Sequence, residues 1–180
     1  VFADAGLSEA FSRAIGLVVQ PGVEFGNQNV ILYDPAKAKA LSGLLISEPQ
    51  FIFEAHSTDY QGTETLSQLV GDGFPILKVG PELTFVLREA LYALDLIASD
   101  LLPEYGNRPL YKAMEALMLA EPANWHKHYH GDASEQRWLR HYSLSDRIRY
   151  YWPHPSAVAA VEGLTKALDG KSIPEPLFWQ

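Results

Sequence analysis

The first half of the chain alternates helical and strand patterns, and no other feature of the sequence limits its fold as strongly. Asp34 and Pro35 supply a cap and a first-turn proline for a helix at 36–46, and Gly73 ends a second helix at 63–72. Short apolar runs on either side of these helices predict three parallel strands near 16–20, 51–55 and 75–79. Such alternation is typical of βαβ units, so we expect an α/β fold built on a parallel sheet.

The pattern changes after Pro103, where no further strand is expected. A long apolar stripe that starts after Pro81 predicts a helix leading up to this point. The segment Ser143-Leu144-Ser145-Asp146 resembles a capping box that would open a short helix. We therefore divide the chain into residues 1–102, which hold the strands, and a helical extension at 103–180. Helices of the extension are expected at 109–120, 122–130, 133–142, 144–151 and 156–168.

The length of the chain limits how much of a barrel it can form. At 180 residues it can hold one domain with a sizeable core, whereas a complete eight-stranded (β/α) barrel takes about 250 residues. The first residue is Val1 rather than methionine. We therefore interpret the chain as a fragment or a trimmed product of a longer protein.

Charge and composition exclude several classes of protein. A net charge of -8 opposes the phosphate backbone of nucleic acids, and the 14 basic residues form no long run, so no nucleic-acid partner is expected. The sequence has no cysteine, which excludes disulfide and thiolate chemistry. No apolar run approaches the roughly 20 residues that cross a bilayer. We expect a soluble, cytoplasmic protein without a membrane partner.

Polar side chains gather where each predicted strand ends. In a parallel barrel the carboxyl ends of the strands open to one face, where active sites lie. Carboxylates, an imidazole and a lysine at such a rim could bind a metal, polarise a carbonyl or hold a phosphate, or they could only cap helices and pair with one another. The candidate substrate-binding residues are Glu24, Glu54, His56, Ser57, Asp59, Lys78 and Glu82, with Gln20 and Thr58 beside them.

Lys78 is the most informative of these residues because it lies in an apolar run, where an unpaired ammonium would be costly. It should therefore pair with a carboxylate such as Glu54 or Asp59, or meet an anionic ligand. The segment Gly80-Pro81-Glu82 that follows opens a helix, whose free N–H groups favour a phosphate. No catalytic residue is assigned from these patterns.

Two further clusters lie in the helical extension. His126, His128 and His130 place three imidazoles within five residues, but only the first and last share a helix face, which favours surface or packed histidines over a metal site. Arginines alternate with aromatic residues further on, and they could clamp a phosphate or form a helical layer packed on the barrel. These residues are Arg137, Arg140, Arg147 and Arg149, with Trp138, Tyr142, Tyr150, Tyr151 and Trp152.

Four runs of the sequence, in order, resemble one known family. They are VVQPGVEF at 18–25, FEAHSTDYQ at 53–61, ILKVGPELTF at 76–85 and YSLSDRIRYYWPH at 142–154. The resemblance is to the non-catalytic subunits of tagatose-1,6-bisphosphate aldolase, a family also called tagatose 6-phosphate kinase. It implies that the chain is the closing, C-terminal part of a TIM (β/α)8 barrel plus a helical C-terminal extension.

The layout is also similar to the last βα units of class II, zinc-dependent ketose-bisphosphate aldolases. In that likeness Glu54-Ala55-His56-Ser57-Thr58 takes the place of H-G-G-S-G, and the segment from Lys78 to Leu83 that of K-I-N-I-D-T. Glu54 then replaces one zinc-ligand histidine and Gln20 or Pro21 another, and a neutral amide or a proline cannot replace an imidazole. We therefore expect no cofactor in this chain and a zinc ion on a partner aldolase subunit.

The resemblance implies an accessory, non-catalytic subunit that supports a catalytic class II aldolase subunit in the breakdown of galactitol, tagatose or N-acetylgalactosamine. The alternative is an enzyme, either a tagatose 6-phosphate kinase or another phosphosugar-processing protein. The sequence contains neither G-x-x-x-x-G-K-[ST] nor a kinase glycine-rich loop. A barrel that only binds phosphosugars is a third hypothesis.

Overall fold

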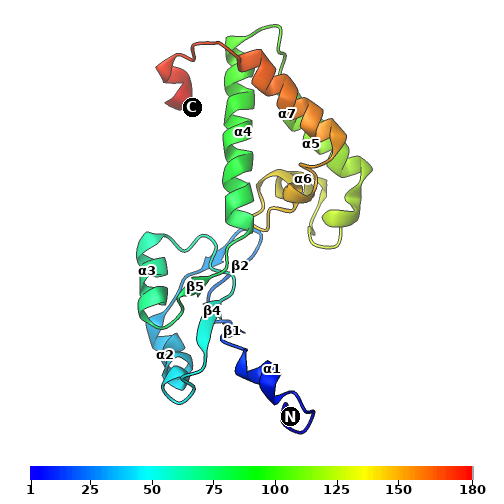
Figure 1. Ribbon diagram of the computed structural model, residues 1–180. Helices are drawn as coiled ribbons and strands as arrows, with labels where there is room; N and C mark the ends of the chain where they lie inside the picture. The colour runs from blue at the N-terminus through cyan, green and yellow to red at the C-terminus, as the bar shows by residue number, and fades with distance from the viewer. Residues whose placement is uncertain (180) are drawn as a thin grey trace. The chain divides into compact units, whose positions relative to one another are not determined.

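The computed structural model describes residues 1–179, which form two compact units, residues 1–80 and a second unit that begins at Pro81. The first unit is built on a parallel sheet, and the second is built from α-helices and 3-10 helices (Figure 1). The fold is therefore mixed α/β with a parallel sheet, as the sequence predicts.

The parallel sheet of the first unit has the strand order β1, β4, β5. β1 (Gly16–Val19) pairs in parallel with β4 (Ile52–Ala55), and β4 pairs in parallel with β5 (Ile76–Leu77). The prediction of three parallel strands is confirmed, although β5 is shorter than expected. Its ladder nevertheless continues by one residue, because Lys78 donates its N–H to the Ala55 carbonyl and accepts from the Thr58 N–H.

α2 and α3 connect strands of this unit where the sequence predicts helices, and α1 precedes β1. They are α1 (Ser8–Ser12), α2 (Pro35–Gly43), the 3-10 turn η1 (Leu44–Ile46) that continues α2, and α3 (Thr63–Gly71). The carboxylate of Asp34 accepts the Ala36 N–H at 3.0 Å, which caps α2 as expected. Gly73 has a φ of 101°, a left-handed conformation that follows the end of α3.

A short antiparallel hairpin after β1 is not foreseen by the sequence. It pairs β2 (Glu24–Phe25) with β3 (Val30–Ile31). The side-chain amide of Gln61 accepts the Tyr33 N–H at 3.0 Å and donates to the Ile31 carbonyl at 3.1 Å. The loop after β4 therefore holds the hairpin in place.

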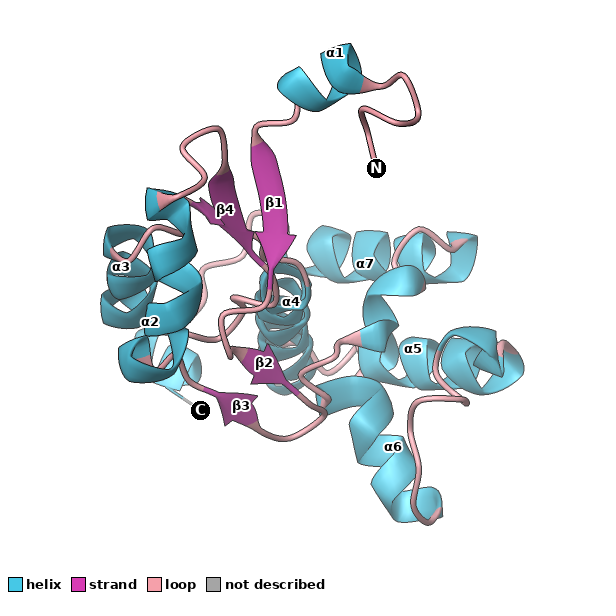
Figure 2. Ribbon diagram, turned by 90° about the horizontal axis from the view of Figure 1, so that it is seen from below, coloured by secondary structure: helices cyan, strands magenta, loops and turns pink. Residues whose placement is uncertain are grey.

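The core of the first unit lies on one face of the sheet. Along β4, Phe53 and Ala55 are buried while Glu54 between them is partly exposed, as the two-residue period of a strand requires. α2 and α3 lie together on the same side of β1 and β4 (Figure 2). The buried apolar residues here are Val23, Tyr33, Ala38, Phe53, Ala55, Leu69 and Phe74.

The second unit contains the long helix α4 (Pro81–Leu101), followed by α5, α6 and α7 with shorter 3-10 segments. Their bounds are α5 (Pro109–Ala120), η2 (Pro122–Asn124), α6 (Ala133–Tyr142), η3 (Arg147–Tyr150), α7 (Pro155–Leu168) and η4 (Glu175–Trp179). α4 packs with α5 and α7, which places the boundary between the compact units at Gly80 and Pro81. The sequence instead assigns α4 to the barrel and divides the chain at 102 and 103, an assignment that stays a prediction about the full-length protein.

The start of α5 is capped from another helix. Its own N-cap residue, Arg108, is left-handed and gives no side-chain cap. Asp95 of α4, fully buried, accepts the N–H groups of Leu110 at 3.1 Å and Tyr111 at 3.0 Å, together with the Tyr105 hydroxyl at 2.7 Å. One buried carboxylate therefore satisfies three donors that would otherwise be unpaired.

Two helical predictions in this unit are wrong in detail. The segment 122–130 is the 3-10 helix η2 followed by turns, and 144–151 contains only η3. The proposed capping box at 143–146 fails because Asp146 is left-handed, with a φ of 47°, while Ser143 Oγ accepts the Ser145 N–H in a local turn. A capping box does open α6, where Asp132 and Glu135 each accept the other's backbone N–H.

Across residues 1–179, no helix is both long and apolar enough to span a membrane.

Candidate functional site

The candidate site lies on the face of the sheet opposite its core. Glu54 is paired with Val18 of β1 and with Ile76 of β5, so these three side chains share that face. Two residues further along, the same alternation brings His56 and Lys78 side by side. The parallel register therefore gathers polar groups from two neighbouring strand ends, as expected for a sheet of this kind.

His56 and Lys78 form the closest polar contact of the site. Lys78 Nζ lies 2.7 Å from His56 Nε2, and His56 Nδ1 lies 3.2 Å from Ser57 Oγ. A charged ammonium can only donate, so Nε2 is the acceptor and the neutral ring carries its proton on Nδ1, directed at Ser57. The sequence predicts a carboxylate or an anion as the partner of Lys78; in the structure its exposed ammonium lies against the imidazole instead.

Asp59 holds the loop after β4 to the end of β5. Its Oδ1 accepts the Gly80 N–H at 2.8 Å, and Thr58 Oγ1 donates to the Lys78 carbonyl at 2.9 Å. Both Asp59 and Thr58 are buried. Ser57 is left-handed, with a φ of 61°, a conformation that is uncommon for residues other than glycine. Buried polar bonds therefore fix the loop that carries the histidine.

The segment after β1 contributes a carboxylate to the same part of the first unit. Gln20 Nε2 donates to Glu24 Oε2 at 2.9 Å and to the Val23 carbonyl at 2.8 Å. The ring of Phe25 meets that of Tyr60 edge-on, with centroids 5.4 Å apart. This contact joins the hairpin that carries Glu24 to the loop after β4.

The structure brings three of the predicted site residues into direct contact, namely His56, Ser57 and Lys78. Glu24, Glu54, His56, Ser57, Asp59 and Lys78 all belong to the first unit. Glu82 lies in the first turn of α4 and belongs to the second unit. Tyr60 and Gln61, which shape the rim, carry no signal in the sequence, because loop residues follow no period that would mark them.

A zinc ion of the class II aldolase kind does not fit the residues that the structure describes. Catalytic zinc sites use three protein ligands drawn from His, Cys, Asp and Glu. Within residues 1–179 there is no group of three such side chains placed to hold a metal ion. His126, His128 and His130 are each exposed on the second unit.

Arg140, Arg147 and Arg149 are each hydrogen-bonded within the second unit. Arg140 is buried and donates to both carboxylate oxygens of Glu115. Arg147 donates to the Asn124 carbonyl, and Arg149 to the Ser145 carbonyl and the Tyr150 hydroxyl. These bonds favour the packed helical layer over a phosphate clamp.

A buried hydrogen-bonded chain adjoins Arg140. His141 lies with Nδ1 2.7 Å from the Tyr92 hydroxyl and Nε2 3.0 Å from Glu115 Oε2. Burial lowers the pKa of His141 to about 4, although the nearby Glu115 carboxylate acts in the opposite direction. Burial also acts to raise the pKa of Glu115, but the hydrogen bond and charge of Arg140 bring it below its ordinary value. His141 is therefore neutral near pH 7, donating from Nε2 and accepting from Tyr92.

Comparison with known proteins connects this architecture to tagatose phosphates. A family model described as D-tagatose-1,6-bisphosphate aldolase subunit GatZ/KbaZ-like matches residues 1–180. A D-tagatose 6-phosphate 4-epimerase from Agrobacterium fabrum is 62% identical over 180 residues, which are 100% of this chain and 42% of that protein. A crystal structure titled as a probable tagatose 6 phosphate kinase from Sinorhizobium meliloti 1021 has a TM-score of 0.93 and 61% identity, covering 98% of this chain and 46% of that one. The chain spans less than half the length of either relative.

Proposed function

Because the chain belongs to the GatZ/KbaZ-like family of D-tagatose-1,6-bisphosphate aldolase subunits, we propose that its sheet carries part of a phosphosugar site, and that the full-length protein is a D-tagatose 6-phosphate 4-epimerase. The single observation that carries this proposal is the contact between His56 and Lys78 on the open face of the sheet. The 62% identical relative with that name supports the choice of reaction. We place the activity in the cytoplasm, where sugar phosphates are metabolised.

The two side chains have complementary parts in this proposal. The Lys78 ammonium anchors the phosphate of the substrate, since it is exposed and projects from a strand end. When Lys78 Nζ donates to the phosphate of the substrate, it no longer donates to His56 Nε2, and the lone pair of that nitrogen becomes free. The imidazole can then take the proton of the C4 hydroxyl as the C3–C4 bond breaks, which leaves an enediolate of C1–C3 and an aldehyde at C4. When the aldehyde turns over before the C3–C4 bond re-forms, His56 returns the proton to the new C4 hydroxyl and the configuration at C4 is inverted. Ser57 accepts from Nδ1 and keeps the ring in the matching tautomer.

The proposal also assigns the sheet to a larger barrel. Within the described residues β1 pairs with β4 alone, and its Leu17 and Val18 side chains are 42% and 63% exposed. Exposed apolar side chains beside an unpaired edge fit a sheet that continues into further strands. We therefore propose that this sheet forms the closing part of a (β/α)8 barrel in the full-length protein.

The test uses the full-length protein and D-tagatose 6-phosphate, with formation of the C4 epimer, D-fructose 6-phosphate, followed by carbon-13 NMR. We expect the wild type to convert one sugar into the other, His56→Asn to lose conversion while still binding, and Lys78→Met to lose binding. Lys39→Met, which removes an exposed lysine of α2, is the matched control and should behave as the wild type. A fully active His56→Asn variant would contradict the proposal.

Calorimetric titration separates an anion anchor from a structural role of Lys78. An anchor predicts that Lys78→Met weakens binding of tagatose 6-phosphate and of tagatose 1,6-bisphosphate, while binding of unphosphorylated tagatose changes little. A purely structural lysine predicts lower stability with phosphosugar binding intact. Equal losses for the phosphorylated and unphosphorylated sugars would count against the anchor.

The second candidate is the accessory subunit of a class II tagatose-bisphosphate aldolase, and the description of the family favours it. In this reading the catalytic zinc belongs to the partner subunit. Aldolase assays of the full-length protein with and without that subunit test it. Cleavage of the bisphosphate only in the mixture, together with no epimerisation by the protein alone, would favour this candidate. A kinase reaction has less support, because the sequence lacks a recognisable ATP-phosphate cradle.

A further inference from the structure

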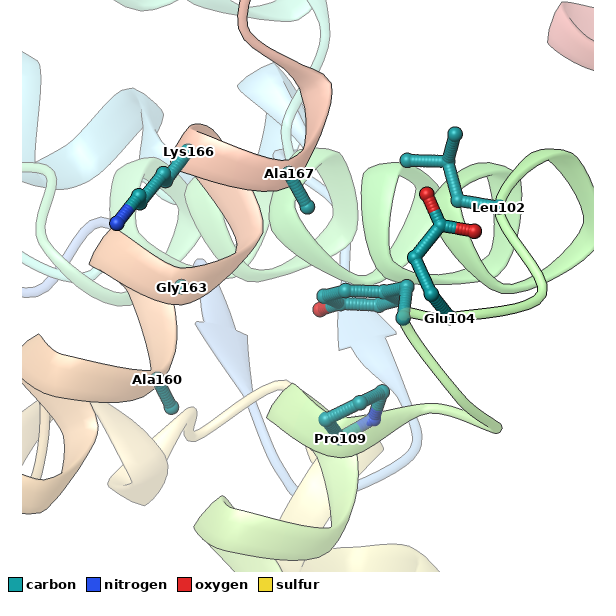
Figure 3. A pocket seen from close by; sticks show the side chains of 8 residues that line it. Leu102, Glu104, Pro109, Ala160, Gly163, Lys166 and Ala167 are labelled. Atoms are coloured by element: carbon teal, nitrogen blue, oxygen red, sulfur yellow. The ribbon is translucent and has the colours of Figure 1, made fainter.

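A concave groove of the second unit lies away from the residues used above. It has a volume of about 460 Å³ and runs between the α4–α5 connection and α7 (Figure 3). Its apolar lining comes from both walls, with Leu102, Tyr105 and Pro109 on the connection and Ala160, Gly163 and Ala167 on α7. Leu102 is buried, whereas Gly163 is exposed, so the groove is open on the side of α7.

A glycine at position 163 lowers the stability of α7, and no contact within residues 1–179 requires a residue without a side chain there. A glycine in the middle of a helix such as α7 lowers stability by about 1 kcal/mol relative to alanine. Its backbone is not left-handed, and a Cβ added at this position would meet nothing within 4 Å. Packing inside residues 1–179 therefore does not explain the glycine, while the close approach of another backbone would.

Two side chains of opposite charge, neither of which forms an ion pair within residues 1–179, lie on opposite walls of the groove. Glu104 lies on the connection and Lys166 on α7 (Figure 3). Both are exposed, and neither side chain takes part in an ion pair or hydrogen bond with the rest of residues 1–179. A molecule that enters the groove should therefore offer a cation to Glu104 and an anion to Lys166.

We propose that the occupant is a second copy of this chain, with α7 of each copy lying in the groove of the other around a two-fold axis near Gly163. In a two-fold interface residue i meets residue j and j meets i, so Lys166 of each copy reaches Glu104 of its partner. The small residues of α7 let the two helices approach closely, and the lining of both grooves becomes buried. The charge pattern is self-complementary, which selects a second copy over an unrelated protein.

The test measures the dimer dissociation constant of the full-length protein by analytical ultracentrifugation. Glu104→Lys and Lys166→Glu should each weaken the dimer about ten-fold or more, because each change replaces two attractive pairs by two repulsive ones. The double variant Glu104→Lys with Lys166→Glu restores both pairs in reversed order and should recover the wild-type constant. Lys112→Glu on α5 alters the net charge equally and should have no effect. Gly163→Leu, which fills the groove, should abolish dimerisation while circular dichroism stays unchanged.

Three outcomes would overturn the proposal. The first is a wild-type protein that remains monomeric at all concentrations, and the second is a dimer indifferent to the single charge changes. The third is a monomer that binds a class II aldolase subunit in a manner sensitive to Gly163→Leu, which would assign the groove to that subunit. None of these outcomes depends on epimerase activity, so the two proposals fail separately.

Discussion

Replacing His141 by glutamine should remove a large part of the acid sensitivity of the second unit. The pKa of His141 is about 4 in the folded chain, against an ordinary value of 6.5. Between these values the unfolded chain binds a proton that the folded chain does not, so the free energy of unfolding falls as the pH drops from about 7 towards 4. Below about pH 4 both states are protonated and the contribution levels off.

The size of this effect follows from the two pKa values. From pH 7 to pH 5 the wild type should lose about 2 kcal/mol of unfolding free energy through this one group. The full difference of about 2.5 pKa units corresponds to about 3 kcal/mol. The imidazole is buried, stacks on the Tyr111 ring with centroids 3.9 Å apart, and meets a carboxylate already paired with Arg140. Glu115 favours a proton on the ring, but burial outweighs it, and the added proton would have to displace the bond from Tyr92.

Urea unfolding of the wild type and of His141→Gln, followed by tryptophan fluorescence at several pH values between 7 and 5, measures this difference. The variant should be less stable at pH 7, because it loses the ring stacking and the Tyr92 bond, but its stability should change about 2 kcal/mol less across this range. His126→Gln, which removes an exposed histidine of the same unit, should keep the wild-type slope. Parallel slopes for His141→Gln and the wild type would refute the assignment of a neutral, buried imidazole.

Two further predictions concern buried polar groups. Asp95→Asn should lower the free energy of unfolding by about 2–4 kcal/mol, because one carboxylate oxygen is replaced by an NH2 group that cannot accept from the third donor. Chemical denaturation measures this loss, and exposed Asp100→Asn should stay within about 0.5 kcal/mol of the wild type. Gln61→Leu should loosen the β2–β3 hairpin, seen as faster hydrogen exchange of the Tyr33 amide, whereas Gln68→Leu on the exposed face of α3 should leave that exchange rate unchanged.

The periodic elements of the fold could be predicted from the sequence because each carries its own local signal. The strand at 52–55 reads as an apolar run, and α2 has a cap and a first-turn proline. The β2–β3 hairpin has two residues in each strand, too few to show a period of two. The predicted capping box at 143–146 does not form, because a serine-rich segment before a charged residue fits both a capping box and a left-handed turn, and tertiary contacts such as that between Thr84 and Asp146 decide between them.

The candidate site was only partly predictable for a similar reason. Sequence places polar residues at strand ends, but it does not give the register between strands. Whether Lys78 meets a carboxylate or His56 depends on which residues of β4 and β5 stand opposite each other, and the pairing of Glu54 with Ile76 decides it. Gln61 was missed because its role depends on two backbone groups about 30 residues earlier in the chain.

The edge of β1 that has no partner strand within residues 1–179 has a consequence for handling this part of the protein in the laboratory. A net charge of -8 favours mutual repulsion between molecules in solution, yet repulsion acts over the whole surface while strand addition needs only four residues. Gly16–Val19 combines exposed valine and leucine side chains with backbone groups that face away from β4, and it carries no charge that would hinder pairing with another molecule. Salt that screens the overall charge should therefore promote self-association at this strand, so low ionic strength should both protect surface ion pairs and limit precipitation.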